Sequence, residues 1–425
     1  MKMHVKQYLP RLLEAQIEEK MATKGCVVIE GPKWCGKSTT AKRFAGSVVN
    51  LQKPHIYKQY RMFADMGDEN LFRGERPIVF DEWQKIPELW DIIRADIDDS
   101  GERGQFILTG SARPIEDKNR HSGTGRIAKI VMRTMSLWES GDSTGEVSLA
   151  ELFEGIDGVG GKNDHNLDRM AFLVCRGGWP GVMFDSDRLA LKGALDYVAS
   201  LTDEDITRVD DIKRNPTRAK AILKAYARNI STPAKLTTIL ADIEANDAVL
   251  DPRTLDSYLN AFEKLYVIED VEAWSPSLRS GTAIRTANIR QFADPSIATA
   301  ILRITPNDLM NDLRTFGFVF ESMAVRDLRV YAESLGGRIY QYHDANGLEV
   351  DTVIRLEDGK WGAAEIKLGG DEYIDAAAKN LLALKAKVNT DKMKEPSFLM
   401  IVTGTQYAYK RPDGVLVVPI GCLKN

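Results

Sequence analysis

Eight consecutive residues have the types and the spacing of a phosphate-binding loop. They are Gly31-Pro32-Lys33-Trp34-Cys35-Gly36-Lys37-Ser38, and Thr39 follows. Glycines at both ends let the backbone bend until successive amide groups point at phosphate oxygens. In such a loop the lysine, Lys37, reaches the β- and γ-phosphates, and the Ser38 hydroxyl binds Mg²⁺. The sequence therefore predicts that residues 31–39 bind ATP together with Mg²⁺.

The residues on either side of this loop predict the two elements that must hold it in place. Residues 26–30 form a short apolar run that is typical of a buried parallel strand, and residues 38–45 are typical of the first turns of a helix. A helix that begins at the loop directs its positive N-terminal end at the bound phosphates. A glycine-rich turn that contained Gly-Lys-Ser by accident would need neither element, so we favour nucleotide binding.

Two further strand ends supply polar groups in the order that ATP hydrolysis requires. The apolar run 77–80 ends in Asp81 and Glu82, and the run 105–108 is followed by Thr109. We expect Asp81 to bind Mg²⁺, Glu82 to act as the base that activates water, and Thr109 to sense the γ-phosphate or orient that water. Each residue alone is more typical of a helix N-cap or a turn. Their order behind a complete phosphate-binding loop favours the catalytic roles.

A second group of charged residues lies in the last third of the chain. This region is expected to fold in the order helix, strand, strand, strand, helix, strand over residues 318–328, 338–342, 348–356, 361–367, 373–388 and 398–402. The period of a strand puts Glu365 and Lys367 on one face, and Asp351 on the preceding strand can point the same way. Asp351 and Glu365 would then bind Mg²⁺ and activate water for phosphodiester cleavage, and Glu321 would complete the cluster. The alternative is the ordinary alternation of a half-solvated hairpin.

With these motifs the sequence resembles the AAA+ superfamily of ATPases. Residues 31–38 look like Walker A, residues 80–82 like Walker B, and Thr109 like sensor 1. More narrowly, the chain resembles a group of prokaryotic ATPases that carry a C-terminal domain of unknown function, through the stretches 108–111, 125–126, 135–139 and 177–180. The resemblance implies an α/β P-loop core with a parallel sheet, ATP hydrolysis, and a homo-oligomer, for which a ring is one arrangement.

The same resemblance implies that an arginine from a neighbouring subunit completes the ATPase site. Arg126 is the first candidate, followed by Arg133 and Arg113. An arginine that acts in this way raises the rate by about 10³- to 10⁵-fold. The alternative is that Arg126 merely forms a surface ion pair.

The C-terminal charged group resembles the active site of the PD-(D/E)xK nuclease fold. Asp351, Glu365 and Lys367 stand at the motif positions, and Glu321 stands at the position of the helix acid. The motif is short and degenerate. The chain also departs from it, because Glu349-Val350-Asp351 replaces the usual proline-aspartate pair. This departure puts cleavage in more doubt than the fold.

The sequence divides into three expected domains: an ATPase core over 1–190, a helical block over 191–275, and the nuclease-like domain over 276–425. In the helical block, helix-start signals at Thr232-Pro233 and Asp251-Pro252 precede an extended run at 265–271. This order is typical of a winged helix, with 254–264 as the recognition helix. Packing or assembly is the alternative role for that helix, because it carries few polar residues. Residues 155–161 are expected to form a flexible surface loop.

DNA is the expected partner of the C-terminal half. A basic segment supports this expectation, because it contains seven basic residues and only two acidic ones, Asp210 and Asp211. The basic residues are Arg208, Lys213, Arg214, Arg218, Lys220, Lys224 and Arg228. Such a segment can follow DNA phosphates, although charged helix faces are usually just solvated. The net charge of −4 argues against a uniformly basic surface.

The composition fits a globular cytoplasmic protein. The 425 residues are 44% hydrophobic and 28% charged, which allows roughly three domains. No apolar run approaches the ~20 residues needed to cross a membrane, so no membrane partner is expected. The four cysteines, Cys26, Cys35, Cys175 and Cys422, have no metal-ligand spacing, and Cys35 in the loop suits a reducing compartment.

The sequence thus predicts an ATP-hydrolysing AAA+ protein whose nucleotide state drives a winged-helix and nuclease-like module acting on DNA. The alternative is a nucleotide-switched scaffold whose C-terminal domain binds DNA or protein without cutting. A small-molecule kinase is a third hypothesis.

Overall fold

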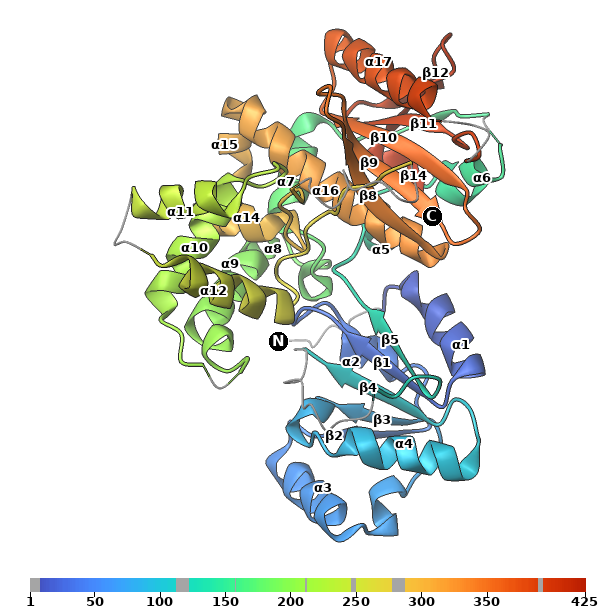
Figure 1. Ribbon diagram of the computed structural model, residues 1–425, viewed down its shortest axis with the longest axis vertical. Helices are drawn as coiled ribbons and strands as arrows, with labels where there is room; N and C mark the ends of the chain where they lie inside the picture. The colour runs from blue at the N-terminus through green and yellow to red at the C-terminus, as the bar shows by residue number, and fades with distance from the viewer. Residues whose placement is uncertain are drawn as a thin grey trace.

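A computed structural model describes residues 8–111, 122–156, 158–210, 212–245, 250–276, 287–388 and 393–425. Figure 1 shows an N-terminal part with one sheet, a helical part, and a C-terminal part with a second sheet. The predicted α/β class with a parallel first sheet is confirmed.

The first sheet holds the predicted phosphate-binding loop. Its five parallel strands lie in the order β2-β3-β4-β1-β5. Their bounds are Cys26–Glu30 (β1), Ser47–Asn50 (β2), Ile78–Asp81 (β3), Phe106–Gly110 (β4) and Ile127–Val131 (β5). Because β4 separates β1 from β3, its end lies between the loop that follows β1 and the acids that follow β3.

Helices cover both faces of this sheet. They are α1 (Leu13–Thr23), α2 (Lys37–Ala41), α3 (Pro54–Met66) and α4 (Leu89–Ser100). α3 and α4 pack on one face with Val28 and Phe80, and α1 and α2 pack on the other with Val27 and Ile107. Burial on both faces explains why the strands appear in the sequence as continuous apolar runs.

The helical part begins after β5. Its helices are α5 (Leu137–Ser140), α6 (Leu149–Phe153), α7 (Leu167–Arg176), α8 (Asp187–Ala190), α9 (Lys192–Asp203), α10 (Pro216–Arg228), α11 (Leu236–Glu244), α12 (Pro252–Lys264), α14 (Pro295–Leu302) and α15 (Pro306–Asn311). Helix starts follow local chemistry: the Asn215 side chain accepts hydrogen bonds from the amides of Thr217 and Arg218, and Pro216 occupies the first turn. The helix expected to start at Asp251-Pro252 is α12, whereas the one expected to start at Thr232-Pro233 begins later, at Leu236 (α11).

The extended run expected after α12 forms antiparallel bridges. Ile268 pairs with Phe292, and Val271 pairs with Ile289. The winged-helix arrangement expected for this block stays a prediction.

The second sheet has seven strands in the order β7-β12-β13-β11-β10-β9-β8. Their bounds are Gly161–Lys162 (β7), Gly337–His343 (β8), Glu349–Leu356 (β9), Trp361–Lys367 (β10), Leu399–Thr403 (β11), Tyr407–Lys410 (β12) and Leu416–Pro419 (β13). β8, β9 and β10 are antiparallel neighbours, and β10, β11 and β13 are parallel.

Two long helices sandwich this sheet. α16 (Leu313–Ser334) packs with Ile366 on one face, and α17 (Asp371–Lys387) packs with Ile401 on the other. The predicted order of helix, three strands, helix and strand is confirmed. Each predicted strand of this sheet matches an observed strand to within one residue at each end, because its apolar residues recur with the period of a strand.

The expectation of a flexible surface loop at 155–161 is wrong for its last residue. Gly161 lies in β7, which pairs with β12, and nearby β6 (Val147–Ser148) pairs with β14 (Leu423–Lys424). Residue 157 lies outside the described residues. A two-residue strand has no periodicity of its own, so the sequence gives no signal for it.

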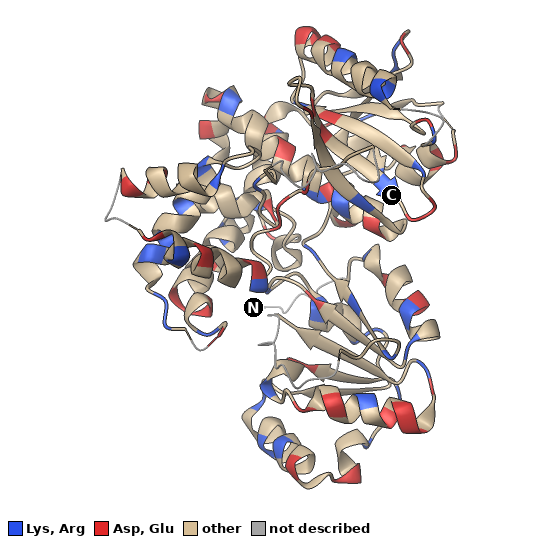
Figure 2. Ribbon diagram, viewed as in Figure 1, with Lys and Arg blue, Asp and Glu red and all other residues tan. Residues whose placement is uncertain are grey.

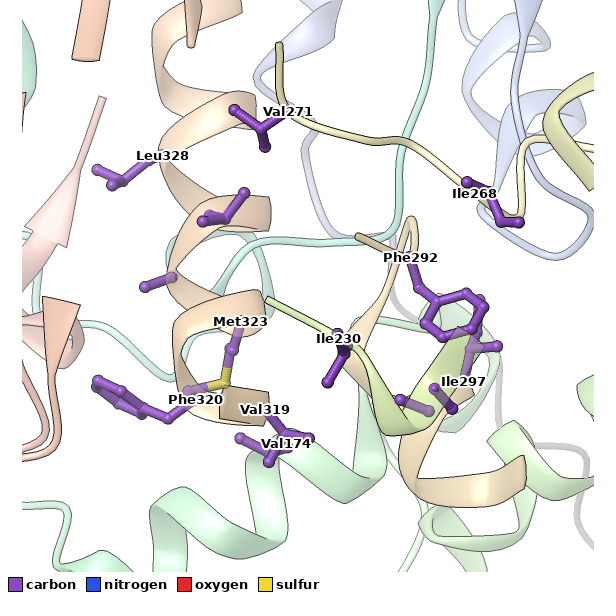
Figure 3. Packing of buried hydrophobic residues seen from close by; sticks show 14 of the residues in the cluster. Val174, Ile230, Ile268, Val271, Phe292, Ile297, Val319, Phe320, Met323 and Leu328 are labelled. Carbon is purple, nitrogen blue, oxygen red and sulfur yellow. The ribbon is translucent and has the colours of Figure 1, made fainter. Parts of the chain in front are cut away.

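The helical part and the second sheet share one apolar core. Figure 3 shows Val174 of α7 close to Val319 of α16, with Ile230 and Phe292 nearby. The same core includes Leu137 and residues of α9. The segment 137–190 therefore packs with the helical part and α16, and the apolar cores do not separate at the predicted boundaries 190 and 275.

Candidate functional site

The phosphate-binding loop joins β1 to α2, as predicted. Gly31 and Gly36 have φ values of 144° and 106°, in the region that favours glycine. A Cβ at Gly31 would also lie 2.1 Å from the carbonyl oxygen of Met132. Both glycines are therefore required for the course of the backbone, and the loop residues up to Thr39 enter the first turn of α2 at its positive end.

Four predicted ATPase residues converge at the end of the sheet. The Ser38 hydroxyl donates to Asp81 Oδ1 at 2.5 Å, and the Thr109 hydroxyl donates to the same oxygen at 2.7 Å. The Lys37 ammonium donates to the carbonyl oxygens of Gly31 and Pro32, at 2.9 and 2.7 Å. Hydroxyl and carboxylate oxygens are the ligands that Mg²⁺ prefers, so the donor set fits that ion.

Glu82 lies beside this group in a left-handed backbone conformation, with φ 61°. Its carboxylate accepts hydrogen bonds from Gln84 at 2.5 Å and from Ser111 at 3.2 Å. A left-handed glutamate costs roughly 1–3 kcal/mol, and such strain is concentrated at functional sites. Gln84 and Ser111 were not predicted, because only the fold brings them to this carboxylate.

A pocket of about 640 Å³ opens over the loop. Its walls include Tyr8 and Leu9 before α1, the loop residue Trp34, and Pro180 and Phe184 after α7. A cavity of this size can hold a drug-sized ligand. The stretch 177–180 is thereby placed against the loop, although the sequence supplied it only as part of a resemblance.

The stretch 177–180 is fixed by close backbone packing. Gly178 accepts a hydrogen bond from the Met135 amide at 2.7 Å, and a Cβ at Gly178 would lie 2.1 Å from the Met135 oxygen. The Trp179 indole donates to Ser296 at 2.9 Å and stacks on Tyr197 at a centroid distance of 4.3 Å. The wall of the pocket is therefore built by the helical part.

Arg11 is a site residue that the sequence did not reveal. Its guanidinium donates to the Cys35 oxygen at 2.8 Å and to Glu139 at 3.1 Å, and all three residues are buried. Lys33 forms an ion pair with Asp205 of the helical part. None of these three contacts has a sequence signal, because Arg11 and Asp205 lie outside every motif, and Glu139 and Asp205 are more than 100 positions from their partners.

Arg126 lies at the amino end of β5, away from the end of the sheet that carries the loop. It forms a 2.6 Å ion pair with Asp98 and is half exposed. Arg133 is buried in ion pairs with Glu269 and Glu333, so it is not presented to a neighbouring subunit. Arg113 lies outside the described residues.

The structure brings the C-terminal candidates together. The Lys367 ammonium lies 2.9 Å from Asp351 and 2.7 Å from Glu365. Asp351 also accepts a hydrogen bond from the Ile366 amide at 2.7 Å. Asn380 of α17, which was not predicted, donates to Glu365 at 3.1 Å. The two strands therefore do place both carboxylates and the lysine on one side, as the period of two predicted.

The charged groups of this cluster act on one another. Burial, followed by the Asp351 charge, raises the pKa of Glu365 to about 8. The same two causes, in the same order, raise the pKa of Glu321 well above its usual value. Burial acts to lower the pKa of Lys367, but Asp351 and Glu365 outweigh it and raise that pKa. The raised pKa keeps Lys367 in its ammonium form at neutral pH.

The described residues contain no group of three or more His, Cys, Asp or Glu side chains arranged to hold a metal ion. In the C-terminal cluster the Lys367 ammonium lies between Asp351 and Glu365, in the position that a shared Mg²⁺ would occupy. The oxygen atoms of this cluster are of the type that binds Mg²⁺, but the Lys367 ammonium already offsets the negative charge beside it.

Buried polar contacts connect the phosphate-binding loop to α16. Glu139 accepts a hydrogen bond from Arg11 and also caps α5. The amide of Leu137 in the same turn donates to Asp327 of α16 at 3.0 Å. Arg326 donates to Asp327 at 2.8 Å and to Asp294 at 3.1 Å. One guanidinium thus faces two buried carboxylates.

Because Arg326 is shared between two buried carboxylates, we expect the stability of the fold to depend on pH. Burial, partly offset by Arg326, raises the pKa of Asp327 from 3.8 to about 6. Between these values the folded chain holds a proton that the unfolded chain has lost, so the contribution of Asp327 to the free energy of unfolding falls as the pH rises. We expect the difference in unfolding free energy between wild type and Asp327→Asn to fall by about 1–3 kcal/mol from pH 4 to pH 7. Urea unfolding at both pH values measures it.

Asp142→Asn is the matched control. Burial acts to raise the pKa of Asp142, but Arg176 outweighs it and lowers that pKa below 3.8. The corresponding difference must therefore rise with pH at about pH 4 and below, and it should change little between pH 4 and pH 7. A difference for Asp327 that also rises with pH would contradict the assignment.

The basic segment 208–228 is largely neutralised. Arg208, Arg214, Lys220 and Arg228 form ion pairs with Glu204, Asp210, Asp203 and Asp242. Figure 2 shows Lys and Arg mixed with Asp and Glu over all three parts of the chain. On α12 the exposed residues include Asp256 and Glu263, which would repel phosphates.

Three family models match separate parts of the chain. Residues 23–140 match a family model described as an AAA domain. Residues 167–308 match one described as a domain of unknown function (DUF8612), and residues 316–423 match another, DUF4143. The chain thus contains an AAA-type ATPase domain, whose loop and acids are the ones described above. No curated protein matches this chain.

Solved structures provide only distant likenesses. A Walker-type ATPase of Pyrococcus abyssi is 15% identical, over 71% of this chain and 98% of that chain, with a TM-score of 0.43. A DNA replication initiation factor is 12% identical over 60% and 92%, with a TM-score of 0.25. A signal transduction ATPase of Pyrococcus horikoshii with a tetratricopeptide repeat sensor is 14% identical over 77% and 48%, also at 0.25. Agreement at these TM-scores is too low to carry a conclusion about this chain.

No helix in the described ranges is long and apolar enough to cross a membrane.

Proposed function

We propose that this protein hydrolyses ATP with Mg²⁺ and that its nucleotide state controls a C-terminal module acting on DNA. The observation that carries the ATPase proposal is the convergence of Lys37, Ser38, Asp81, Glu82 and Thr109 at one end of a parallel sheet, under a pocket of about 640 Å³. These groups supply a cation for the phosphates, oxygen ligands for a metal, a base, and a hydroxyl beside the metal ligand.

The proposed mechanism assigns one task to each group. The amides of the loop and the Lys37 ammonium bind the phosphates. Ser38 and Asp81 would hold Mg²⁺, and the ion would supply positive charge close to the phosphates. Glu82 accepts the proton of the attacking water, while Gln84 and Ser111 orient its carboxylate. Most of the rate enhancement then comes from positioning and charge stabilisation.

Control of the C-terminal part is supported by the buried contacts from Cys35 through Arg11 and Glu139 to Asp327 of α16. α16 also carries Glu321, whose pKa responds to the charge of Asp351. A shift of the loop on nucleotide binding would therefore act on the helix that carries one acid of the C-terminal cluster.

The DNA-acting role rests on the cluster of Asp351, Glu365, Lys367 and Glu321 and on the winged-helix order of the helical part. In the nuclease, Asp351 and Glu365 would hold Mg²⁺, and Lys367 would activate water or stabilise the developing charge. A second candidate is a nucleotide-switched scaffold that binds DNA or protein without cutting. It is favoured by the position of the Lys367 ammonium between the two carboxylates.

Cleavage of single- and double-stranded DNA with Mg²⁺ or Mn²⁺, with and without ATP, decides between these candidates. Asp351→Asn removes the charge but keeps an acceptor for the Ile366 amide, so it should abolish products without unfolding the strand. Glu349→Gln, on the same strand and exposed, is the matched control. Products that Asp351→Asn abolishes support the nuclease, and a further loss in Lys37→Ala makes cutting ATP-coupled. ATP turnover without products supports the scaffold.

We also propose that the ATPase acts as a homo-oligomer in which Arg126 contacts the nucleotide of a neighbouring subunit. The half-exposed side chain, far from its own loop, supports this role. Arg126→Ala should then lower ATP turnover by at least about tenfold while ATP binding is kept. Turnover at the wild-type rate would leave Arg126 with only its ion pair to Asp98.

A further inference from the structure

A second cavity, far in sequence from the phosphate-binding loop, lies between four helices of the helical part. α9, α10, α11 and α14 enclose about 590 Å³. This volume is in the range of small-molecule sites. The cavity lies within the segment that matches a domain of unknown function, and the proposed ATPase and nuclease groups take no part in it.

The floor of this cavity is apolar. Val198, Ala225, Ile243 and Ala300 line it and are each at most 9% exposed. Leu195 lines its edge and remains 47% exposed. Small alanines where the helices meet leave the space open, and an apolar body of a ligand would be stabilised by covering Leu195.

The rim of the cavity is cationic. Lys220, Lys224 and Arg228 follow one another at four-residue intervals on α10 and therefore share one helix face. Arg303, just after α14, is the fourth cation, and Asp242 is the acid of the lining.

Part of this positive charge lacks a partner. Lys220 pairs with Asp203 at 2.8 Å, and Arg228 pairs with Asp242 at 3.7 Å. In the part of the chain that the structure describes, Lys224 and Arg303 have no carboxylate at ion-pair distance. The rim therefore carries an excess of about two positive charges, which is the charge of one phosphate monoester dianion.

We propose that the cavity between α9, α10, α11 and α14 binds a small phosphate monoester that carries an apolar body. The head group contacts Lys224 and Arg303, and the apolar body lies on Val198, Ala225 and Ile243. Single-stranded nucleic acid fits less well, because base stacking uses aromatic side chains and the lining has none among the described residues.

Calorimetric titration of the full-length protein with n-octyl phosphate, below its micelle concentration, tests this proposal. We expect one molecule bound per chain, and Lys224→Ala and Arg303→Ala should each weaken binding by about tenfold, the effect of one charge-assisted hydrogen bond. Lys213→Ala removes an exposed cation of the same segment outside the cavity and should leave the affinity unchanged. Inorganic phosphate should bind at least tenfold more weakly than n-octyl phosphate, and Leu195→Ser should weaken only the octyl compound.

Several outcomes would overturn the proposal. They are the absence of binding, equal binding by wild type and the Lys224→Ala/Arg303→Ala double variant, and equal affinity for inorganic and octyl phosphate. Loss of binding in Lys37→Ala would place the compound at the phosphate-binding loop instead. Circular dichroism of each variant separates lost binding from lost folding.

Discussion

Replacing Glu82 by glutamine is expected to lower ATP turnover by about 10²- to 10⁴-fold, the usual contribution of a general base, while ATP binding is retained. Glutamine has the shape of glutamate and can still contact Gln84 and Ser111, but it cannot accept a proton from water. The carboxylate of Glu82 is well placed for this task, because Gln84 and Ser111 hold it and Glu82 lines the pocket over the loop.

Two measurements on Glu82→Gln define the outcome: steady-state phosphate release, and equilibrium binding of a fluorescent ATP analogue. Glu88→Gln changes a nearby exposed acid that pairs with Arg61 and should have wild-type values in both. Turnover near the wild-type rate in Glu82→Gln would assign the base to another group. Loss of binding would instead show that Glu82 holds the nucleotide.

Lys37→Ala is expected to weaken ATP binding by about 10²-fold and to reduce turnover to background. A charge-assisted hydrogen bond contributes roughly 1.5–3 kcal/mol, and each 1.4 kcal/mol is a factor of ten in affinity. The Lys37 ammonium is buried and held against the oxygens of Gly31 and Pro32, so it is already positioned for the phosphates.

Lys42→Ala is the matched control for Lys37→Ala, because Lys42 is an exposed lysine directly after α2. Equal ATP affinity in the two variants would contradict the role of Lys37. Urea unfolding must accompany both, because Lys37 also satisfies two backbone carbonyls of the loop and its removal leaves them without that donor.

The sequence predicted more about the phosphate-binding loop than about the C-terminal cluster of charged residues. The loop 31–39 is contiguous, and its chemistry depends on its own backbone and side chains. Asp351, Glu365 and Lys367 come from two strands that are neighbours along the chain, so the period of a strand was enough to place them together. Their charge state was not predictable, because it depends on how deeply the sheet and α16 bury them.

From the sequence alone it was possible to predict the phosphate-binding loop, the acids at the end of β3, and the strands β1, β3, β4 and β8 to β11, since each depends on local geometry and on the pattern of apolar residues. Only the tertiary structure decided that β4 puts Thr109 within reach of Asp81 and that Arg11 joins Cys35 to Glu139. It alone assembled the cavity between α9, α10, α11 and α14. These features depend on which elements pack together over long separations, and that choice is made by the burial of whole helix and sheet faces rather than by any short run of residues.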